Sequence, residues 1–152
     1  MKPAYFDTMI AKGLTLGSVE SISGGLFAWH LTQHAHASRF YQGGLVVYND
    51  HVKEALAHVD VTLLKKHTAI SREVALELAK GILEDIQCDV AVSLVGNAGP
   101  TAQDNQPVGK CFIALVSKNT QDVLEVDLVG SRNEIQQQLV ELADQQINHW
   151  IQ

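Results

Sequence analysis

Hydroxyl-bearing and small residues follow the first apolar run of the sequence. Residues 18–25 read SVESISGG, so Ser21 and Ser23 stand just before Gly24 and Gly25. Backbone N–H groups at a helix start can hold a phosphate, or the oxyanion formed when a serine attacks a carbonyl. The alternative is structural, because serine is a good helix cap and glycine allows close packing. The segment matches neither G-x-x-x-x-G-K-[ST] nor G-x-G-x-x-G.

A nucleophilic serine needs a base, and the chain has seven histidines. His30 and His34 are four residues apart in an expected helix and His36 follows closely, a spacing that could bind a metal ion. No obvious third ligand and no H-E-x-x-H motif accompany them, which favours solvent-exposed helix histidines. No Ser-His-Asp set can be chosen from the residues alone.

Alternating helix and strand patterns surround these residues and predict an α/β fold. We expect one domain over residues 1–152, an α/β sandwich with about five strands in a mostly parallel or mixed sheet and helices packed on it. Ser71 and the pair Ser131 and Glu134 are typical of helix caps. Strands are expected at 14–19, 40–49, 88–96, 111–117 and 123–129 with a hairpin at 118–122, and helices at 3–12, about 23–33, 50–59, 61–67, 71–86 and from 131 onward.

Two glycine-containing strand exits are the natural ligand-binding positions, because ligands of α/β sheets bind near the carboxyl ends of strands. They lie at residues 20–25 and 96–100. The second exit begins a loop, residues 96–109, that has no regular pattern. Loops of this length inside compact domains are often functional.

The composition disfavours several classes of partner. Eleven Lys and Arg against 17 Asp and Glu give a net charge of −6, which argues against nucleic acid. No apolar run reaches the roughly 18–20 residues that span a bilayer, and the N-terminus does not resemble a signal peptide. Cys88 and Cys111 lie in apolar segments and are expected to be buried, reduced thiols. These features predict a soluble, cytoplasmic protein that binds no membrane.

Six segments occur in the order of the motifs of the CinA C-terminal domain family, which the chain resembles over about residues 5–148. They are VESISGG, YQGGLVVYNDHVKEALAHV, HTAISREVALELAKGILE, DVAVSLVGNAGP, QPVGKCFIALV and GSRNEIQQQL. Active members of this family are nicotinamide mononucleotide deamidases. The resemblance therefore implies an amidohydrolase that takes a small nucleotide substrate and needs neither a metal nor an organic cofactor.

The resemblance also assigns the catalytic roles. The family motif E-S-C-T-G-G, whose serine is the nucleophile of a Ser/Lys amidohydrolase, matches residues 20–25 and implies Ser21 as the nucleophile. The motif G-G-x-x-x-Y-x-x-x-x-K matches residues 43–53, which implies Lys53 as the general base with Tyr48 as a supporting hydroxyl. Lysine is a base only when neutral, so its pKa must fall about three units from about 10.4.

Substrate-binding roles follow from the same motifs. Backbone N–H groups of the Gly-Gly pair are expected to face the oxyanion or the phosphate. Arg132 lies in the family's G-D-R-like segment, where its positive charge is unfavourable beside the positive end of the dipole of the last helix. A phosphate bound at this position would turn the unfavourable interaction into a favourable one. The expected substrate-binding residues are Ser23, Gly24, Gly25, Gly96, Asn97, Ala98, Gly99 and Arg132.

The chain departs from the family motifs at several positions, of which three change the chemistry most. Ile22 replaces a cysteine, and Val95 and Lys110 replace threonines in the third and fourth motifs. A lost oxyanion donor costs about 10²–10³ in rate, and Asn97 is a candidate substitute for the Val95 hydroxyl. The departures keep two alternatives open: an inactive relative that acts as a nucleotide-binding or interaction protein, and an amidase of another small substrate. The sequence also permits a homodimer.

Overall fold

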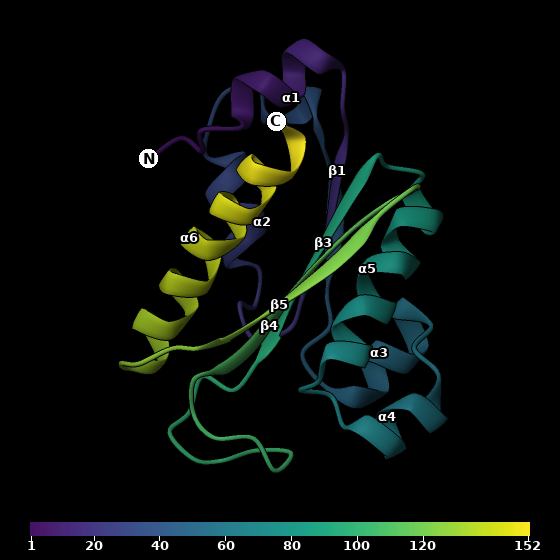
Figure 1. Ribbon diagram of the computed structural model, residues 1–152, viewed down its shortest axis with the longest axis vertical. Coiled ribbons are helices and arrows are strands. Elements are labelled where there is room, and N and C mark those ends of the chain that lie inside the picture. Colours follow the sequence, from purple (N-terminus) through teal and green to yellow (C-terminus); the bar gives the residue numbers. More distant parts are fainter.

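The computed structural model describes residues 1–152 as five strands, six α-helices and one 3₁₀ helix (Figure 1). The predicted α/β class is confirmed. In chain order the elements are α1 (Phe6–Lys12), β1 (Leu16–Glu20), α2 (Leu26–Thr32), η1 (Ala37–Arg39), β2 (Tyr41–Val46), α3 (Asp50–Ala57), α4 (Val61–His67), α5 (Arg72–Ile86), β3 (Val90–Gly96), β4 (Lys110–Ser117), β5 (Gln121–Asp127) and α6 (Arg132–Ile151).

The five strands form one mixed sheet in the order β2-β1-β3-β4-β5. Strand β1 pairs in parallel with β2 and β3, whereas β4 runs antiparallel to both β3 and β5. The β4–β5 connection lies where the sequence predicted a hairpin. Because β1, β2 and β3 are parallel, their carboxyl ends meet at one edge, where ligands of α/β sheets bind.

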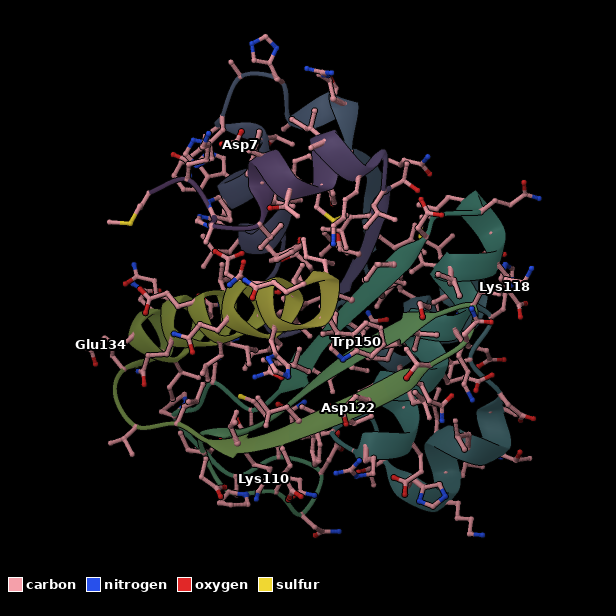
Figure 2. The ribbon with its side chains drawn as sticks, turned by 45° about the horizontal axis from the view of Figure 1, so that its top comes forward. Asp7, Lys110, Lys118, Asp122, Glu134 and Trp150 are labelled. Carbon is pink, nitrogen blue, oxygen red and sulfur yellow. The ribbon has the colours of Figure 1, made fainter.

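Helices cover both faces of the sheet and bury two separate cores (Figure 1). Helices α1, α2 and α6 cover one face, where Phe6 and Phe40 pack edge-on with ring centroids 4.8 Å apart. Helix α6 lies along this face with Glu134 in its first turn and Trp150 near its end (Figure 2). Helices α3, α4 and α5 cover the other face. None of the helices is both long and apolar enough to cross a membrane.

Side-chain caps fix the helix starts that the sequence predicted. Ser71 Oγ accepts a hydrogen bond from the N–H of Val74, 3.2 Å away, and Ser131 and Glu134 form a reciprocal capping box. Both cysteines are free and buried as expected. Burial raises the pKa of Cys111 to about 12, so its thiol is inert at neutral pH.

The prediction of solvent-exposed helix histidines is wrong for two of them. His30 is half-buried, and its Nε2 lies 2.6 Å from Asp144 Oδ2 on α6. His34 is also half-buried and packs edge-on against Phe6, with no hydrogen-bond partner for its Nε2. Helix α2 packs against α6 on the side that carries His30. The spacing of the histidines alone did not reveal this contact between the two helices. No three His, Cys, Asp or Glu side chains are grouped to hold a metal ion.

Strands β1 and β2 approach each other closely at Gly44. A Cβ atom at this position would collide with the backbone carbonyl and the hydroxyl of Ser18. The Ser18 hydroxyl is buried and lies 2.7 Å from the Tyr41 hydroxyl. A glycine at position 44 therefore sets the distance between the strands that lead to Ser21 and to Lys53.

Candidate active site

A cavity of about 370 Å³ opens at the edge where β1, β2 and β3 end. Its lining contains four residues that the sequence singled out from three different segments, namely Ser21, Tyr48, Lys53 and Gly96. The other lining residues are Asn49, Asp50, Ala69, Ile70, Val95, Gln103 and Asp104. A larger cavity of about 550 Å³, between the N-terminal segment, α2 and α6, contains none of the predicted catalytic residues.

A tight turn after β1 presents Ser21 to the cavity. The Ser21 N–H donates to the Leu94 carbonyl at 2.9 Å and continues the β1–β3 pairing one residue beyond the strand. The Gly24 N–H donates back to the Ser21 carbonyl at 3.1 Å and closes the turn. Gly24 and Gly25 have φ angles of +59° and +102°, which glycine adopts without strain.

The start of α2 is occupied by a carboxylate of the protein itself. Glu20, which is buried, accepts hydrogen bonds from the N–H groups of Phe27 at 2.8 Å and Ala28 at 3.0 Å. The Gly24 N–H is also engaged, so these three N–H groups are not free to hold an oxyanion or a phosphate. The N–H groups of Ile22, Ser23 and Gly25 form no hydrogen bond within the chain.

The Ser23 side chain does not cap helix α2, as one interpretation of the sequence had suggested. Helix α2 begins at Leu26, and no side chain acts as its N-cap at Gly25. The Ser23 hydroxyl is buried without a hydrogen-bond partner and does not line the cavity. The glutamate that caps the helix precedes it in β1, so a search for a serine cap next to the helix could not find it.

Lys53 combines burial with a lack of hydrogen-bond acceptors. Asn49 caps α3 by accepting a hydrogen bond from the Val52 N–H, which places Lys53 in the first turn. The Lys53 side chain is 3% exposed, and its nearest carboxylate atom is Asp50 Oδ1 at 3.9 Å. Burial lowers the pKa of Lys53, whereas the charges of Asp50 and Asp104 raise it. The direction of the pKa shift is the one that a catalytic base requires.

Arg132 links three segments around the cavity without lining it. Its guanidinium donates one hydrogen bond to the Tyr48 hydroxyl and another, of 2.5 Å, to the Gly99 carbonyl. Tyr48 itself is 60% exposed, so this contact lies at the surface. Helix α6 is thereby attached to the segment after β2 and to the loop after β3.

The loop of residues 96–109 is organised by Asn97. Its Nδ2 donates to the carbonyls of Thr101 at 2.9 Å and Gln106 at 3.2 Å, and its Oδ1 accepts from the Gly99 N–H at 2.9 Å. Both polar atoms of the Asn97 amide are thus hydrogen-bonded inside the loop. The amide therefore does not replace the hydroxyl that the family has at position 95. Asn97, Ala98 and Gly99 do not line the cavity, and they shape the loop that borders it.

The two threonine replacements have different surroundings. Val95 is buried and lines the cavity beside Gly96. Lys110 lies outside the cavity at the start of β4, where its Nζ contacts Glu125 at 3.0 Å and Asp127 at 2.8 Å on β5. The charge gained at position 110 is therefore paired within the sheet, and only the change at position 95 alters the cavity.

The sequence model of the family described as CinA C-terminal domain matches residues 1–151. The chain belongs to the CinA C-terminal domain family. "Protein MG115 homolog" of Mycoplasma pneumoniae is 39% identical over 144 residues, which are 94% of this chain and 92% of that protein. A Bacillus subtilis protein described as competence-damage inducible is 39% identical over 124 residues, 82% of this chain, but the match spans only 30% of that longer protein.

Solved structures of the CinA superfamily share the fold. A competence/damage inducible protein from Agrobacterium tumefaciens has a TM-score of 0.93 at 29% identity, covering 97% of this chain and 92% of that one. A CinA superfamily protein from Escherichia coli has a TM-score of 0.92 at 28% identity, covering 96% and 86% of the two chains.

Proposed function

We propose that the protein is an amidohydrolase that converts nicotinamide mononucleotide to nicotinate mononucleotide and ammonia. The observation that carries the proposal is the presence of both Ser21 and Lys53 in the lining of one cavity. Lys53 is buried there without a hydrogen-bond acceptor and with a lowered pKa. The CinA-family resemblance of the motifs around both residues supports the nicotinamide carboxamide as the substrate group.

The first half of the reaction releases ammonia. Neutral Lys53 takes the proton of the Ser21 hydroxyl while its Oγ attacks the carboxamide carbon. The oxyanion forms beside the free N–H groups of Ile22 and Ser23, which follow the nucleophile directly. Lys53 then returns the proton to the leaving nitrogen, and the C–N bond breaks to give an acyl-enzyme and ammonia.

The second half regenerates Ser21. Lys53, neutral again, accepts a proton from water, and the hydroxide attacks the ester carbon of the acyl-enzyme. The proton passes from Lys53 to Ser21 Oγ as the ester bond breaks, and the product acid releases its own proton to solvent and leaves as a carboxylate. Tyr48 borders the cavity, and its hydroxyl accepts a hydrogen bond from Arg132, whose cation is the proposed contact for the phosphate.

Ammonia release from nicotinamide mononucleotide tests the proposal. Ser21→Ala removes the nucleophile and should reduce turnover at least about 10³-fold. Ser38→Ala, on the exposed surface of η1, is the matched control and should retain full turnover. Undiminished ammonia release by a folded Ser21→Ala protein would contradict the Ser/Lys mechanism.

A second candidate is a nucleotide-binding protein without turnover, and Val95 is the observation that favours it. The side chain faces the cavity where the family has a hydroxyl, so an oxyanion donor would be missing. Calorimetric binding of nicotinamide mononucleotide by the wild-type protein, without ammonia release, would support this candidate over the amidohydrolase.

A further inference from the structure

The cavity carries more negative than positive charge. Asp50 and Asp104 both line it, and Lys53 is the single basic side chain in its lining. The lining thus has a formal charge of −1 when Lys53 is protonated and −2 when Lys53 is neutral.

The two carboxylates line the cavity of Lys53 from different segments. Asp50 is the first residue of α3, with Oδ1 3.9 Å from Lys53 Nζ and a side chain that is 63% exposed. Asp104 is half-buried in the loop after β3 and acts on the Lys53 charge from that side. The two backbone hydrogen bonds between Gln103 and Gln106, of 3.1 Å and 2.8 Å, hold Asp104 at the tip of this loop.

These charges create a conflict for a lysine base. The carboxylates favour the protonated ammonium, whereas the proposed reaction requires the neutral amine. A substrate that brings one positive charge into the cavity would reduce the formal charge of the lining from −2 to −1 while Lys53 is neutral. The same charge would disfavour protonation of Lys53, since like charges destabilise each other.

We propose that Asp50 and Asp104 select a substrate whose carboxamide is attached to a cationic ring, and that the charge of this ring helps to keep Lys53 neutral. This inference rests on the proposed function and assigns the recognition of the ring charge of its substrate to two side chains, Asp50 and Asp104. A neutral aromatic or aliphatic amide would leave the two carboxylates without a counter-charge and would bind less tightly. The phosphate of the nucleotide plays no part in this selection.

Binding to Ser21→Ala protein tests the selection without turnover. Calorimetry compares nicotinamide mononucleotide with its 1,4-dihydro form, which keeps the ribose, phosphate and carboxamide but has a neutral ring. We expect the cationic form to bind about 3–10-fold more tightly, a preference that weakens as salt rises. Asp104→Asn on the same background should reduce the preference to less than about 2-fold and leave the affinity for the dihydro form unchanged.

Asp122→Asn is the matched control, because it removes one carboxylate from exposed strand β5, near the β4–β5 turn (Figure 2). It should leave the preference intact. Equal preferences in the Ser21→Ala and Ser21→Ala/Asp104→Asn proteins would overturn the inference, as would equal affinities for the two nucleotides. Absence of binding of either form would overturn it as well.

A kinetic readout separates the inference from the proposed function. In an otherwise wild-type chain, Asp104→Asn should raise KM for the cationic substrate about 3–10-fold. The increase of kcat/KM with pH should also occur at lower pH in this variant, because a carboxylate that favours the Lys53 ammonium is lost. Turnover with an unchanged KM and pH profile would overturn the inference while the amidohydrolase stands. A wild-type protein without turnover but with the Asp104-dependent binding preference would retain the inference and contradict the proposed reaction.

Discussion

The guanidinium of Arg132 donates a hydrogen bond to the hydroxyl of Tyr48, which lies 84 positions earlier in the chain. A second N–H of the same group donates to the Gly99 carbonyl. Arginine has five N–H donors in a planar fork, so three of them remain for a ligand. Arg132 is therefore both a structural link and a candidate phosphate contact.

Arg132→Met separates these two roles. Loss of a charge-assisted phosphate contact should raise KM for nicotinamide mononucleotide about 10–100-fold. Nicotinamide riboside lacks the phosphate, so its kcat/KM should change less than about 3-fold. Steady-state ammonia release from both substrates measures the difference. Equal losses with both substrates would instead show that Arg132 acts through Tyr48 and the loop.

Lys53→Met should abolish turnover and stabilise the fold. Because the pKa of Lys53 is lowered in the folded state, the unfolded chain binds more protons between that lowered pKa and about 10.4. Wild-type stability therefore rises with pH through this window, and the cost of the buried ammonium is fully present below it. We expect Lys53→Met to be about 1–2 kcal/mol more stable than wild type at pH 7.

Urea unfolding at pH 7 and pH 10 checks this prediction. The advantage of Lys53→Met over wild type should shrink at pH 10, as the wild-type lysine loses its charge. Lys65→Met, on the exposed surface of α4, is the control and should show no such pH dependence. A Lys53→Met protein that is clearly less stable at pH 7 would show that the ammonium is well solvated or paired.

Glu20→Gln should destabilise the fold by about 2–3 kcal/mol, because two helix N–H groups lose a charged acceptor and the new amide opposes them. A chain of this size should then melt several degrees lower. Glu84→Gln on exposed α5 changes the same charge and should leave the melting temperature within about 1 °C. Thermal unfolding by circular dichroism compares the two, and equal melting temperatures would refute the capping role.

Val95→Thr should raise the deamidation rate at least about 10-fold, because it returns a hydroxyl to the cavity lining. Burial of that hydroxyl should cost about 1–2 kcal/mol of stability. Val92→Thr, equally buried in β3 but packed in the core on the other face, should show the cost without the gain. A rate unchanged by Val95→Thr would show that another group supplies the donor.

The elements of the fold were predictable because the hydrophobic periods and helix caps are local. The capping box at Ser131 and Glu134 predicted the start of α6 within a residue. The start of α2 was misplaced because its cap, Glu20, belongs to the preceding strand. The order of the strands depends on pairings between distant segments, which no local pattern specifies.

The candidate site was predictable in part. Family motifs indicated Ser21, Tyr48 and Lys53, and the parallel strands bring all three to one cavity. Asp50 lies inside the second motif and Asp104 in the long loop. Nothing in the sequence indicates that either carboxylate lies in the same cavity as Lys53. Their relation to Lys53 depends on how the loop folds over the end of the sheet, which is a tertiary property.

The carboxylate of Glu20 has a consequence for the end of the proposed catalytic cycle. The reaction turns an uncharged amide into an anion next to Ser21, and an open helix start there would retain that anion. Glu20 already fills the nearest donors, and Asp50 and Asp104 repel a third negative charge. The product keeps the cationic ring, but its added negative charge is repelled by these carboxylates, so it should bind less tightly than the substrate and product inhibition should be weak.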